Sequence, residues 1–473
     1  MDMLSLLPDP ILFSIVSLLP FKEAARTSSL CKRWVHLWRS TTNIDFNEYF
    51  FVNHEDDETK RSQKLAFVKF INNFLNNYQE PFIEKFSLKL SKPSEFSDTV
   101  QHCIAFAFQR GVRQLELDFS ERACDEDDND DEEGGDDNQV ASFRLPSDIY
   151  GFYNNNGGSR RLESLKLFSC EFSLSDLMNN FVGLKDVSFG YVALNLDEVE
   201  ELLFNYVGNI ESLSLKKCWN LPHFDVGSDR NLNLRRLAID RCNFENDYIV
   251  FKAPNLRYLK YSGAVGAYDM NVDEAFEEAD LDFSSENYAE LGDVLYKVLL
   301  DLYAVKVLTV CSYFLQAIPL GEEPFRVHMD LNLKHLIMKA SLQTTEFWGI
   351  SFLLESSPSL HTLTFNLASP AFIFQDYEGP VTNIDARRFW MDQTRYFKCL
   401  KTSLEVVNMK GFRGSYNEYF MLHALVKCGK VLKKMNIYLS TQDTATKIQQ
   451  HNAMLQFLHT TPKASPHLNI SIY

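Results

Sequence analysis

Hydrophobic residues dominate the segment from residue 7 to residue 38, LPDPILFSIVSLLPFKEAARTSSLCKRWVHLW. Asp9 can cap a helix and Pro10 can take its first position. Large apolar residues then follow at helical spacing, at Ile11, Leu12, Ile15, Leu18 and Leu19. Phe13 and Val16 make the other side apolar, and Pro20 ends the helix after about two and a half turns. A short helix that is apolar nearly all round predicts an interface.

A second apolar row follows at helical spacing, at Trp34, Leu37 and Trp38, while Lys32, Arg33 and His36 face the other way. The whole segment therefore predicts three short helices with more apolar surface than they can hide from water. An alternative is an N-terminal helical cap that closes a repeat array. A cap needs one apolar face, and this segment has two, which favours a surface that binds a partner.

From residue 83 onward a short pattern, L-x-x-L-x-L with other large apolar residues substituting, returns throughout the chain. The clearest copies begin at Leu162, Leu184, Ile210, Leu234 and Leu256, at separations of 22, 26, 24 and 22 residues. This period is typical of leucine-rich repeats, in which each unit adds one strand to a curved parallel sheet. Further copies are predicted at Ile83, Val112, Val305, Leu333, Leu360, Leu404 and Leu432, with a weaker one at Phe276.

Three cysteines support this register, because Cys170, Cys218 and Cys242 each lie eight residues after the start of their repeat. At this position a small polar or thiol side chain turns inward, so we expect all three to be buried and unreactive. The nine cysteines of the chain show no C-x-x-C spacing. Their number and spacing argue against a disulfide framework and a zinc site, and favour a reducing compartment.

The N-terminal segment resembles an F-box over its whole length. The resemblance rests on Leu7-Pro8, on the helix that ends Leu18-Leu19-Pro20, on the linker Phe21–Ala25, and on Lys32-Arg33-Trp34 with Trp38. It implies docking onto a Skp1-type adaptor and, through that adaptor, membership of a cullin-based ubiquitin ligase. The residues that the resemblance assigns to adaptor binding are Leu7, Pro8, Ile11, Leu12, Ile15, Leu18, Leu19, Pro20, Trp34, Leu37 and Trp38.

The stretch from Ser356 to Ser440 is similar to the FBD segment of plant F-box/leucine-rich-repeat proteins. The matching residues are Leu404, Val406, Val407, Gly411, Phe412, Gly414, Leu432, Lys434 and Met435. The pattern predicts a strand, a glycine-bearing turn, a helix from Glu418 to Cys428 and a second strand. In the helix, we expect Phe420, Leu422, Leu425 and Val426 to point inward.

The formal net charge is −17, and ten acidic residues without a basic one lie between Asp125 and Asp137. This balance argues against binding to nucleic acid or to an anionic membrane. The acidic run falls in a gap of 50 residues between repeats and predicts a disordered loop over residues 121–141, or alternatively an acidic cover for a basic surface. Charged residues also interrupt the apolar stretch from Tyr296 to Leu320, which argues against a membrane span.

No local signature of catalysis is present: the chain has no G-x-S-x-G, H-E-x-x-H or glycine-rich phosphate loop. We therefore expect no catalytic residues, no metal site and no cofactor. A hydrolase or transferase would need a clustered constellation that the sequence does not offer. Binding specificity is expected on the open face of the sheet, where residues between the repeat leucines point away from the core.

The candidates for target binding on that face are Lys166, Lys216, Arg236, Tyr258 and Lys260. Four of these residues are basic, which predicts a patch for an acidic segment of a partner. The alternative is that these lysines and arginines only solubilise the surface. The sequence therefore leaves two interpretations of this face open.

Together the patterns predict an α/β protein, with a three-helix F-box (residues 1–45), a leucine-rich-repeat solenoid with a parallel β-sheet (46–355), FBD-like terminal repeats (356–440) and a C-terminal segment (441–473). The predicted function is that of the substrate-recognition adaptor of a Skp1–cullin–F-box ubiquitin ligase, in the nucleus or cytoplasm. Its partners would be a Skp1-like adaptor, through it a cullin, and an unknown protein substrate. The alternative is a repeat scaffold for protein interactions that does not assemble into a ligase.

Overall fold

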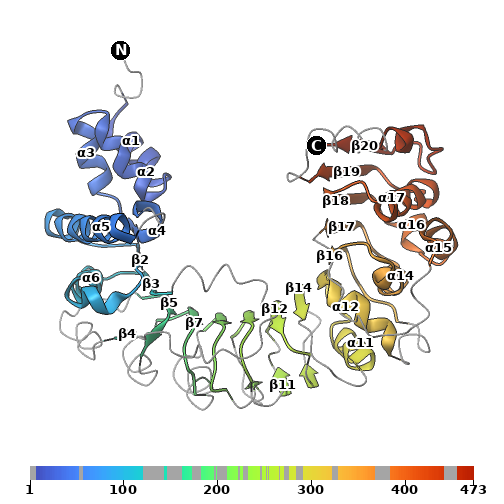
Figure 1. The fold of residues 1–473 in the computed structure, drawn as a ribbon, viewed down its shortest axis with the longest axis horizontal. Helices are drawn as coiled ribbons and strands as arrows, with labels where there is room; N and C mark the ends of the chain where they lie inside the picture. The colour runs from blue at the N-terminus through green and yellow to red at the C-terminus, as the bar shows by residue number, and fades with distance from the viewer. Residues whose placement is uncertain are drawn as a thin grey trace. The chain divides into compact units, whose positions relative to one another are not determined.

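The leucine-rich pattern corresponds to a ladder of parallel strands (Figure 1). The structure is a computed structural model, and it describes residues 7–52, 57–120, 143–145, 162–172, 183–195, 199, 210–221, 224–226, 233–244, 248–251, 253, 255–265, 267–270, 276–283, 291–321, 329–367, 384–440 and 455–473. The predicted acidic loop at 121–141 lies outside these described residues.

Each predicted repeat start is buried and lies two residues before a strand. This holds for the weak copy too, since Phe276 is fully buried and β14 begins at Glu278. The predicted mixed α/β fold with a parallel repeat sheet is therefore confirmed. The strands that follow these starts are β2 (Lys85–Lys89), β3 (Gln114–Asp118), β5 (Ser164–Phe168), β7 (Asp186–Gly190), β8 (Ser212–Lys216), β10 (Arg236–Asp240), β12 (Tyr258–Gly263), β14 (Glu278–Phe283), β15 (Val307–Cys311), β16 (His335–Ala340), β17 (Thr362–Leu367), β18 (Val406–Phe412) and β19 (Lys434–Leu439).

Two further strands complete this sheet and were not predicted: β1 (Asn43–Asn47) and β20 (Asn469–Ile472). Among the described residues the sheet has 15 strands in the order β1-β2-β3-β5-β7-β8-β10-β12-β14-β15-β16-β17-β18-β19-β20. β1 pairs with β2 in parallel, and β20 pairs with β19 in the same way. The repeat register is thus continued by segments that lack the leucine pattern.

Smaller strands lie on the return segments. β4 (Phe143–Arg144) pairs with β6 (Cys170–Glu171), and β11 (Tyr248–Phe251) pairs in parallel with both β9 (Phe224–Val226) and β13 (Ala267–Met270). These short strands lie in the segments that connect one main strand to the next. The described part of the chain therefore has β-structure on the return side as well as in the main sheet.

The chain divides into two compact units, residues 1–222 with 242–245 and residues 223–241 with 246–473. In the first unit, short N-terminal helices precede β1, and two longer helices cover one side of strands β1 to β3 (Figure 1). Its helices within the described ranges are α1 (Asp9–Ser17), α2 (Phe21–Arg26), the 3₁₀ helix η2 (Thr27–Ser29), α3 (Lys32–Arg39), α4 (Glu48–Phe51), α5 (Asp57–Asn77), η3 (Pro93–Phe96) and α6 (Ser97–Gln109).

In the second unit, helices of the described ranges also lie along one side of the sheet (Figure 1). These helices are α11 (Leu291–Asp301), α12 (Ser312–Ala317), η5 (Ile318–Leu320), η6 (Thr344–Glu346), α14 (Phe347–Glu355), α15 (Ala386–Gln393), α16 (Cys399–Thr402) and α17 (Tyr416–Cys428). Gly349 of α14 lets this helix approach α12 closely, because a Cβ there would lie 2.1 Å from the carbonyl oxygen of Leu315.

The FBD-like end has the predicted order of strand, glycine turn, helix and strand, in β18, α17 and β19. Gly411 and Gly414 have φ of 78° and 74°, a region that L-residues other than glycine seldom occupy. The helix begins two residues earlier than predicted, because the Ser415 hydroxyl accepts the backbone N–H of Glu418 at 3.2 Å. Leu422, Leu425 and Val426 are buried as predicted, whereas Phe420 is half-buried.

Candidate functional site

The three N-terminal helices pack around a small interior. Leu12 and Val16 of α1 are buried, as are Ala24 of α2 and Trp34 of α3. α1 ends at Ser17, close to the predicted stop before Pro20. The two helices α1 and α3 lie in contact, so the row that contains Leu12 and Val16 is used to hold this bundle together.

Asp9 does not cap α1 as predicted. The helix begins at Asp9 itself, after Pro8, and no side chain caps it. The carboxylate of Asp9 instead accepts from Arg33 of α3, with 2.6 Å between Oδ1 and Nε, and Arg33 also donates to the carbonyl oxygen of Leu7 at 2.7 Å. The start of α1 is thus tied to α3 by an ion pair.

The same bundle leaves large apolar side chains exposed. The exposed fraction is 48% for Ile11, 85% for Leu18, 37% for Leu19 and 59% for Leu30. Pro8 and Pro20 are exposed too, and Leu7 and Ile15 are half-buried. Positions 11, 15 and 18 share one side of α1, because residues three and four apart in a helix are neighbours. These eight residues are called the N-terminal apolar surface below.

Leu37 and Trp38 face the interior of the first unit. Trp38 stacks on Phe74 of α5 with 5.3 Å between ring centroids, and Phe21 meets Phe46 of β1 edge to face at 5.4 Å. Four of the residues that the F-box resemblance assigns to adaptor binding, Leu12, Trp34, Leu37 and Trp38, are buried within the chain. Their physical role is to fix the helices to β1 and α5. Leu30 is exposed but was not among the predicted residues, because it falls outside both helical rows.

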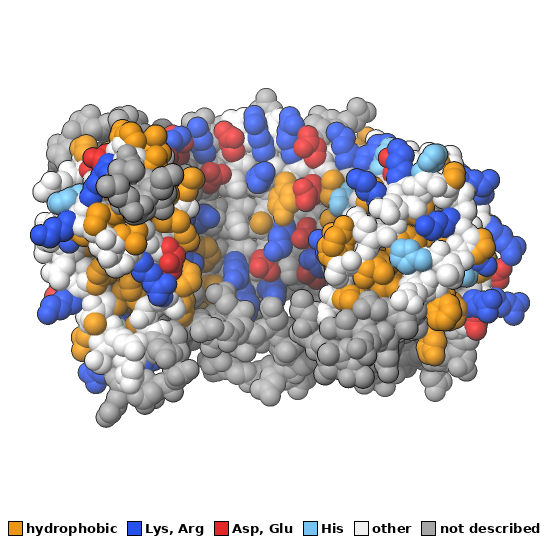
Figure 2. All heavy atoms as spheres, turned by 90° about the horizontal axis from the view of Figure 1, so that it is seen from above, with side chains coloured by type: hydrophobic (Ala, Val, Ile, Leu, Met, Phe, Trp, Pro, Cys, Tyr) orange, Lys and Arg blue, Asp and Glu red, His pale blue; other side chains and the backbone are white. Residues whose placement is uncertain are grey.

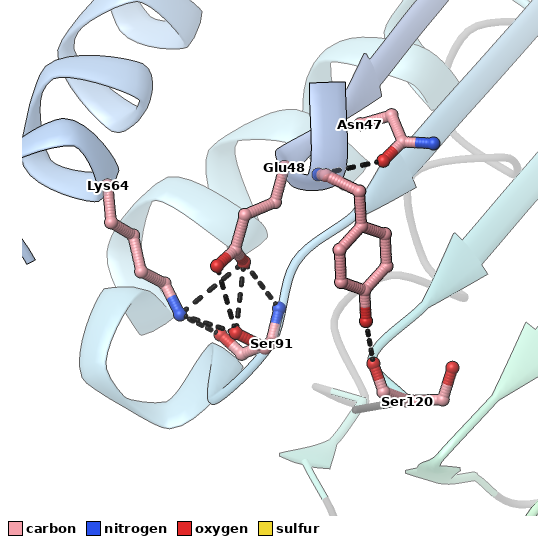
Figure 3. A network of polar contacts seen from close by, with 6 residues as sticks. Asn47, Glu48, Lys64, Ser91 and Ser120 are labelled. Carbon is pink, nitrogen blue, oxygen red and sulfur yellow. Dashed lines mark hydrogen bonds and ion pairs between the residues drawn. The ribbon is translucent and has the colours of Figure 1, made fainter. Parts of the chain in front are cut away.

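A buried ion pair joins the end of this bundle to the first repeats (Figure 3). Glu48, the first residue of α4, lies 3.5 Å from the Lys64 ammonium nitrogen on α5, and their side chains are 1% and 8% exposed. The Glu48 carboxylate also accepts from the backbone N–H of Ser91 at 2.8 Å and from its hydroxyl at 3.0 Å. Burial lowers the pKa of Lys64, an effect that the Glu48 charge opposes.

The neighbouring residues extend this junction to the next strand. The side-chain oxygen of Asn47 accepts the backbone N–H of Tyr49 at 3.0 Å and so caps α4. The Tyr49 hydroxyl donates to the carbonyl oxygen of Ser120, after β3, at 3.0 Å (Figure 3). We call Asn47, Glu48, Tyr49, Lys64, Ser91 and Ser120 the junction network. Sequence reasoning missed it, and its one local signal was an asparagine followed by an acidic residue, which is common at helix starts.

The candidate target-binding residues lie on the open face of the sheet, and each is considered within its own unit. Lys166 is exposed on β5, in register with Glu116 of β3. The Lys216 ammonium lies 5.2 Å from the ring centre of Tyr191. In the second unit, the Arg236 guanidinium lies 5.8 Å from the ring centre of Tyr258, and Lys260 is in register with Asp280 of β14.

Carboxylates accompany these basic residues. In the first unit Glu116 lies 3.3 Å from both Lys85 and Lys89, and Asp118 lies 3.1 Å from Lys89. Burial alone would raise the pKa of Glu116, but Lys89 and Lys85 lower it overall. In the second unit Lys339 bridges Asp280 at 3.1 Å and Asp282 at 3.0 Å. Figure 2 shows basic and acidic side chains interspersed on the molecular surface. In the strand register, Lys166 and Lys260 each have an acidic neighbour, Glu116 and Asp280.

The prediction that these cysteines are buried is confirmed for two of the three positions. Cys170 and Cys218 are buried, whereas Cys242 is only half-buried. Burial raises the pKa of Cys170 above its ordinary value, and a contact with the Cys242 thiol together with burial raises the pKa of Cys218. Within the described ranges no cluster of histidine, cysteine and acidic residues could hold a metal ion. None of the helices described there is long and apolar enough to cross a bilayer.

Comparison with known families matches this architecture. A model described as the F-box domain matches residues 4–44, which contain the N-terminal apolar surface. A model described as the At1g61320/AtMIF1 LRR domain matches residues 140–413, more than half of the chain. The chain belongs to the F-box/LRR-repeat protein family.

Relatives of this F-box/LRR-repeat chain come from Arabidopsis thaliana. The F-box protein At3g62230 is 32% identical over 441 residues, which is 92% of this chain and 91% of that protein. A second relative, the F-box/FBD/LRR-repeat protein At4g26340, is 25% identical over 471 residues, 98% of each chain. Both similarities cover more than nine tenths of this chain.

Proposed function

We propose that this F-box/LRR-repeat protein is the substrate-recognition subunit of a Skp1–cullin–F-box ubiquitin ligase. In this proposal the F-box binds a Skp1-like adaptor, which connects it to a cullin, and the repeats capture a protein target. The chain itself performs no catalysis, because ubiquitin transfer belongs to other subunits of such a ligase. The protein would act inside the cell, in the nucleus or cytoplasm.

The observation that carries this proposal is the N-terminal apolar surface. Ile11, Leu18 and Leu30 are each about half or more exposed, although their side chains are among the most apolar in the chain. Burying such a side chain contributes roughly 1.5–3 kcal/mol, so a partner that covers all three would gain substantial free energy. Since the surface lies in a matched F-box domain, a Skp1-type adaptor is the partner that best accounts for it.

The division into functional parts follows the same proposal. Residues 1–45 dock the adaptor, residues 46–355 form the body of the repeats, residues 356–440 form the FBD-like end, and residues 441–473 form the C-terminal segment. Lys166, Lys216, Arg236, Tyr258 and Lys260 stay candidates for target contacts. The acidic neighbours of Lys166 in the first unit and of Lys260 in the second favour target segments that present both charges to each unit.

Co-purification with a Skp1-type adaptor tests the proposal. The full chain is coexpressed with the adaptor, and the complex is measured by gel filtration and by affinity. The double variant Ile11→Asp, Leu18→Asp should abolish binding, because it places two charges on the docking surface. Leu300→Asp is the matched control, since Leu300 is an exposed leucine of the second unit and should leave binding unchanged.

Wild-type affinity in the folded double variant would show that the docking surface is misassigned. Failure of the wild-type chain to bind any Skp1-type protein from its own species would favour the repeat scaffold that does not join a ligase. Circular dichroism of each variant establishes that it is folded.

A further inference from the structure

The last strands of the second unit carry a surface that the preceding proposal does not use. Its residues are those of β17 to β20 whose side chains point away from the helices, together with His335 of β16 and Tyr473, which follows β20. We call this surface the C-terminal face. It consists of His335, Thr362, Thr364, Asn366, Val406, Asn408, Lys410, Lys434, Asn436, Tyr438, Asn469, Ser471 and Tyr473. Apart from the half-buried Val406, its members are polar or aromatic, which suits recognition more than packing.

Four of these side chains form a hydrogen-bonded ladder across neighbouring strands. Asn436 donates to the side-chain oxygen of Asn408 at 2.9 Å, and Asn408 donates to the Thr364 hydroxyl at 3.2 Å. The same hydroxyl lies 2.9 Å from Nε2 of His335. Whether the Thr364 hydroxyl donates to His335 Nε2 or accepts from it is set by the tautomer of the imidazole. The two asparagine amides donate in one direction along the ladder, toward Thr364, and so hold one another in place.

The hydrogen bonds of the ladder leave some donors and acceptors of the two asparagines for a ligand. An asparagine amide has two N–H donors and one oxygen acceptor. Asn436 uses one N–H within the ladder, so its second N–H and its oxygen remain, and Asn408 likewise keeps one N–H. A donor and an acceptor side by side match the C=O and N–H of an extended peptide backbone.

Two lysines flank the ladder. Lys410 and Lys434 are exposed, and within the described ranges neither has an ion-pair or hydrogen-bond partner for its ammonium group. None of the outward residues of β17 to β20 is acidic. The nearest acidic residue in the sequence, Glu405 at the edge of β18, is held by Lys433 at 2.7 Å. The C-terminal face therefore differs from β14, where Asp280 and Asp282 already hold Lys339.

An aromatic platform lies beside Lys410. Tyr438, in register with Lys410, stacks on Tyr473 with 4.8 Å between ring centroids and 15° between ring planes. The two residues are 39% and 64% exposed. Stacked rings of this kind offer a flat apolar surface to a proline, aliphatic or aromatic side chain.

We propose that the C-terminal face binds an extended acidic peptide segment of the target, with carboxylates on Lys410 and Lys434, backbone groups on Asn408 and Asn436, and one apolar side chain on Tyr438 and Tyr473. This inference rests on the proposed function as a target-capturing subunit and names the site and the chemistry of capture. The charge complementarity of two unpartnered lysines on a face without carboxylates selects an anionic segment.

The strand geometry sets the spacing of the acidic residues. Lys434 is the first residue of β19 and Lys410 lies beside its fifth residue, Tyr438. Four strand residues at about 3.3 Å each separate these positions by about 13 Å along the strand. A peptide in extended conformation covers this span with acidic residues four positions apart. Two lysines are few for a nucleic acid, whose binding usually needs many phosphate contacts.

Selection from a random ten-residue peptide display library on the full-length chain tests this inference. Enriched peptides should carry two acidic residues four positions apart with an apolar residue nearby. Fluorescence anisotropy then measures the best peptide against variants. Lys410→Glu and Lys434→Glu should each weaken its binding about tenfold or more, and Asn436→Ala should weaken it less.

Lys430→Glu is the matched control, because Lys430 is an exposed lysine of the same unit outside the C-terminal face. Enriched peptides without acidic residues, equal loss of binding in Lys430→Glu, or no enrichment over the Lys410→Glu, Lys434→Glu double variant would each overturn the inference. Adaptor binding is measured in parallel on the same proteins. Loss of adaptor binding with intact peptide binding would count against the ligase role alone, and the reverse would count against this site alone.

Discussion

Glu48 and Lys64 bury opposite charges 3.5 Å apart between α4 and α5. The Glu48 carboxylate also accepts from the backbone N–H and the hydroxyl of Ser91. Lys64 in turn donates to the Ser91 hydroxyl at 2.9 Å. This closed set of contacts links a residue just after the F-box helices to the segment after β2.

Removal of Glu48 should therefore destabilise the first unit strongly. Glu48→Ala leaves the Lys64 ammonium buried without its counter-charge, which typically costs about 3–5 kcal/mol. Urea unfolding followed by circular dichroism measures the loss. The control is Glu405→Gln, which removes a carboxylate from the exposed pair with Lys433 and should leave the unfolding midpoint nearly unchanged. An equal loss of stability in both variants would show that the buried pair in the junction network stabilises the protein no more than the exposed pair does.

Substitution of a buried residue in the N-terminal helices should lower stability, whereas substitution of an exposed residue should lower the affinity for the adaptor. Trp38→Ala removes a side chain that stacks on Phe74 and should lower the free energy of unfolding by about 3–5 kcal/mol. Leu18→Ala should change it by about 0.5 kcal/mol or less, because Leu18 is 85% exposed. Its effect should appear in adaptor affinity, as a loss of roughly 2 kcal/mol. A stability loss at Leu18 without an affinity loss would contradict this assignment.

Acid should weaken the second unit through His335. Burial, and the nearby charge of Lys410, lower the pKa of this imidazole below its ordinary value. The unfolded chain then takes up a proton on His335 at a higher pH than the folded chain does. The stability that the neutral imidazole contributes is present above about pH 6.5 and is lost as the pH falls through that value toward the lower folded pKa.

Comparison with two variants checks this direction. Between pH 7 and pH 5 the wild type should lose more stability than His335→Gln, which cannot titrate. Lys410→Gln should reduce the acid sensitivity of the wild type, because it removes the charge that opposes protonation. A steeper pH dependence in Lys410→Gln would show that the lysine acts in another way.

Thiol alkylation should follow burial. Cys31 is exposed and should react with iodoacetamide in the native protein, whereas Cys170 and Cys311 should react only after unfolding. Burial raises the pKa of Cys311 to about 12, which leaves little thiolate at neutral pH. Peptide mass spectrometry after timed alkylation measures each site. Native-state labelling of Cys170 as fast as that of Cys31 would mean that the repeat interior opens readily.

The repeat register was predictable because a buried leucine or its equivalent stands two residues before each repeat strand. β1 was missed because Thr41 occupies that position, and its side chain is buried without being apolar. β20 was missed because His467 stands there instead of a leucine. These two segments form strands by backbone pairing with a neighbouring strand. Such pairing cannot be detected in the pattern of hydrophobic residues.

The candidate site was predictable only in outline. The helical spacing placed both Leu18 and Trp38 in apolar rows and did not distinguish them. In the structure, α5 covers Trp38 and leaves Leu18 exposed. The spacing could not reveal this difference, because α5 comes later in the chain. The basic residues Lys166 and Lys260 were found by alternation, whereas Glu116 and Asp280, which lie in register with them, come from neighbouring strands. The ladder from Asn436 to His335 likewise depends on lateral register between strands, which the order of residues along one repeat does not reveal.

Each described repeat strand begins two residues after a buried repeat start. Repeat positions can therefore be numbered from that start in every member of the family. Residues two, four and six positions after each start lie on the open face, as Thr362, Thr364 and Asn366 do after Leu360. These positions can be identified in any relative from its sequence alone. Amino-acid differences between relatives that are confined to these positions would indicate that target preference changed during evolution. The residues at the buried starts would reflect only the requirements of folding.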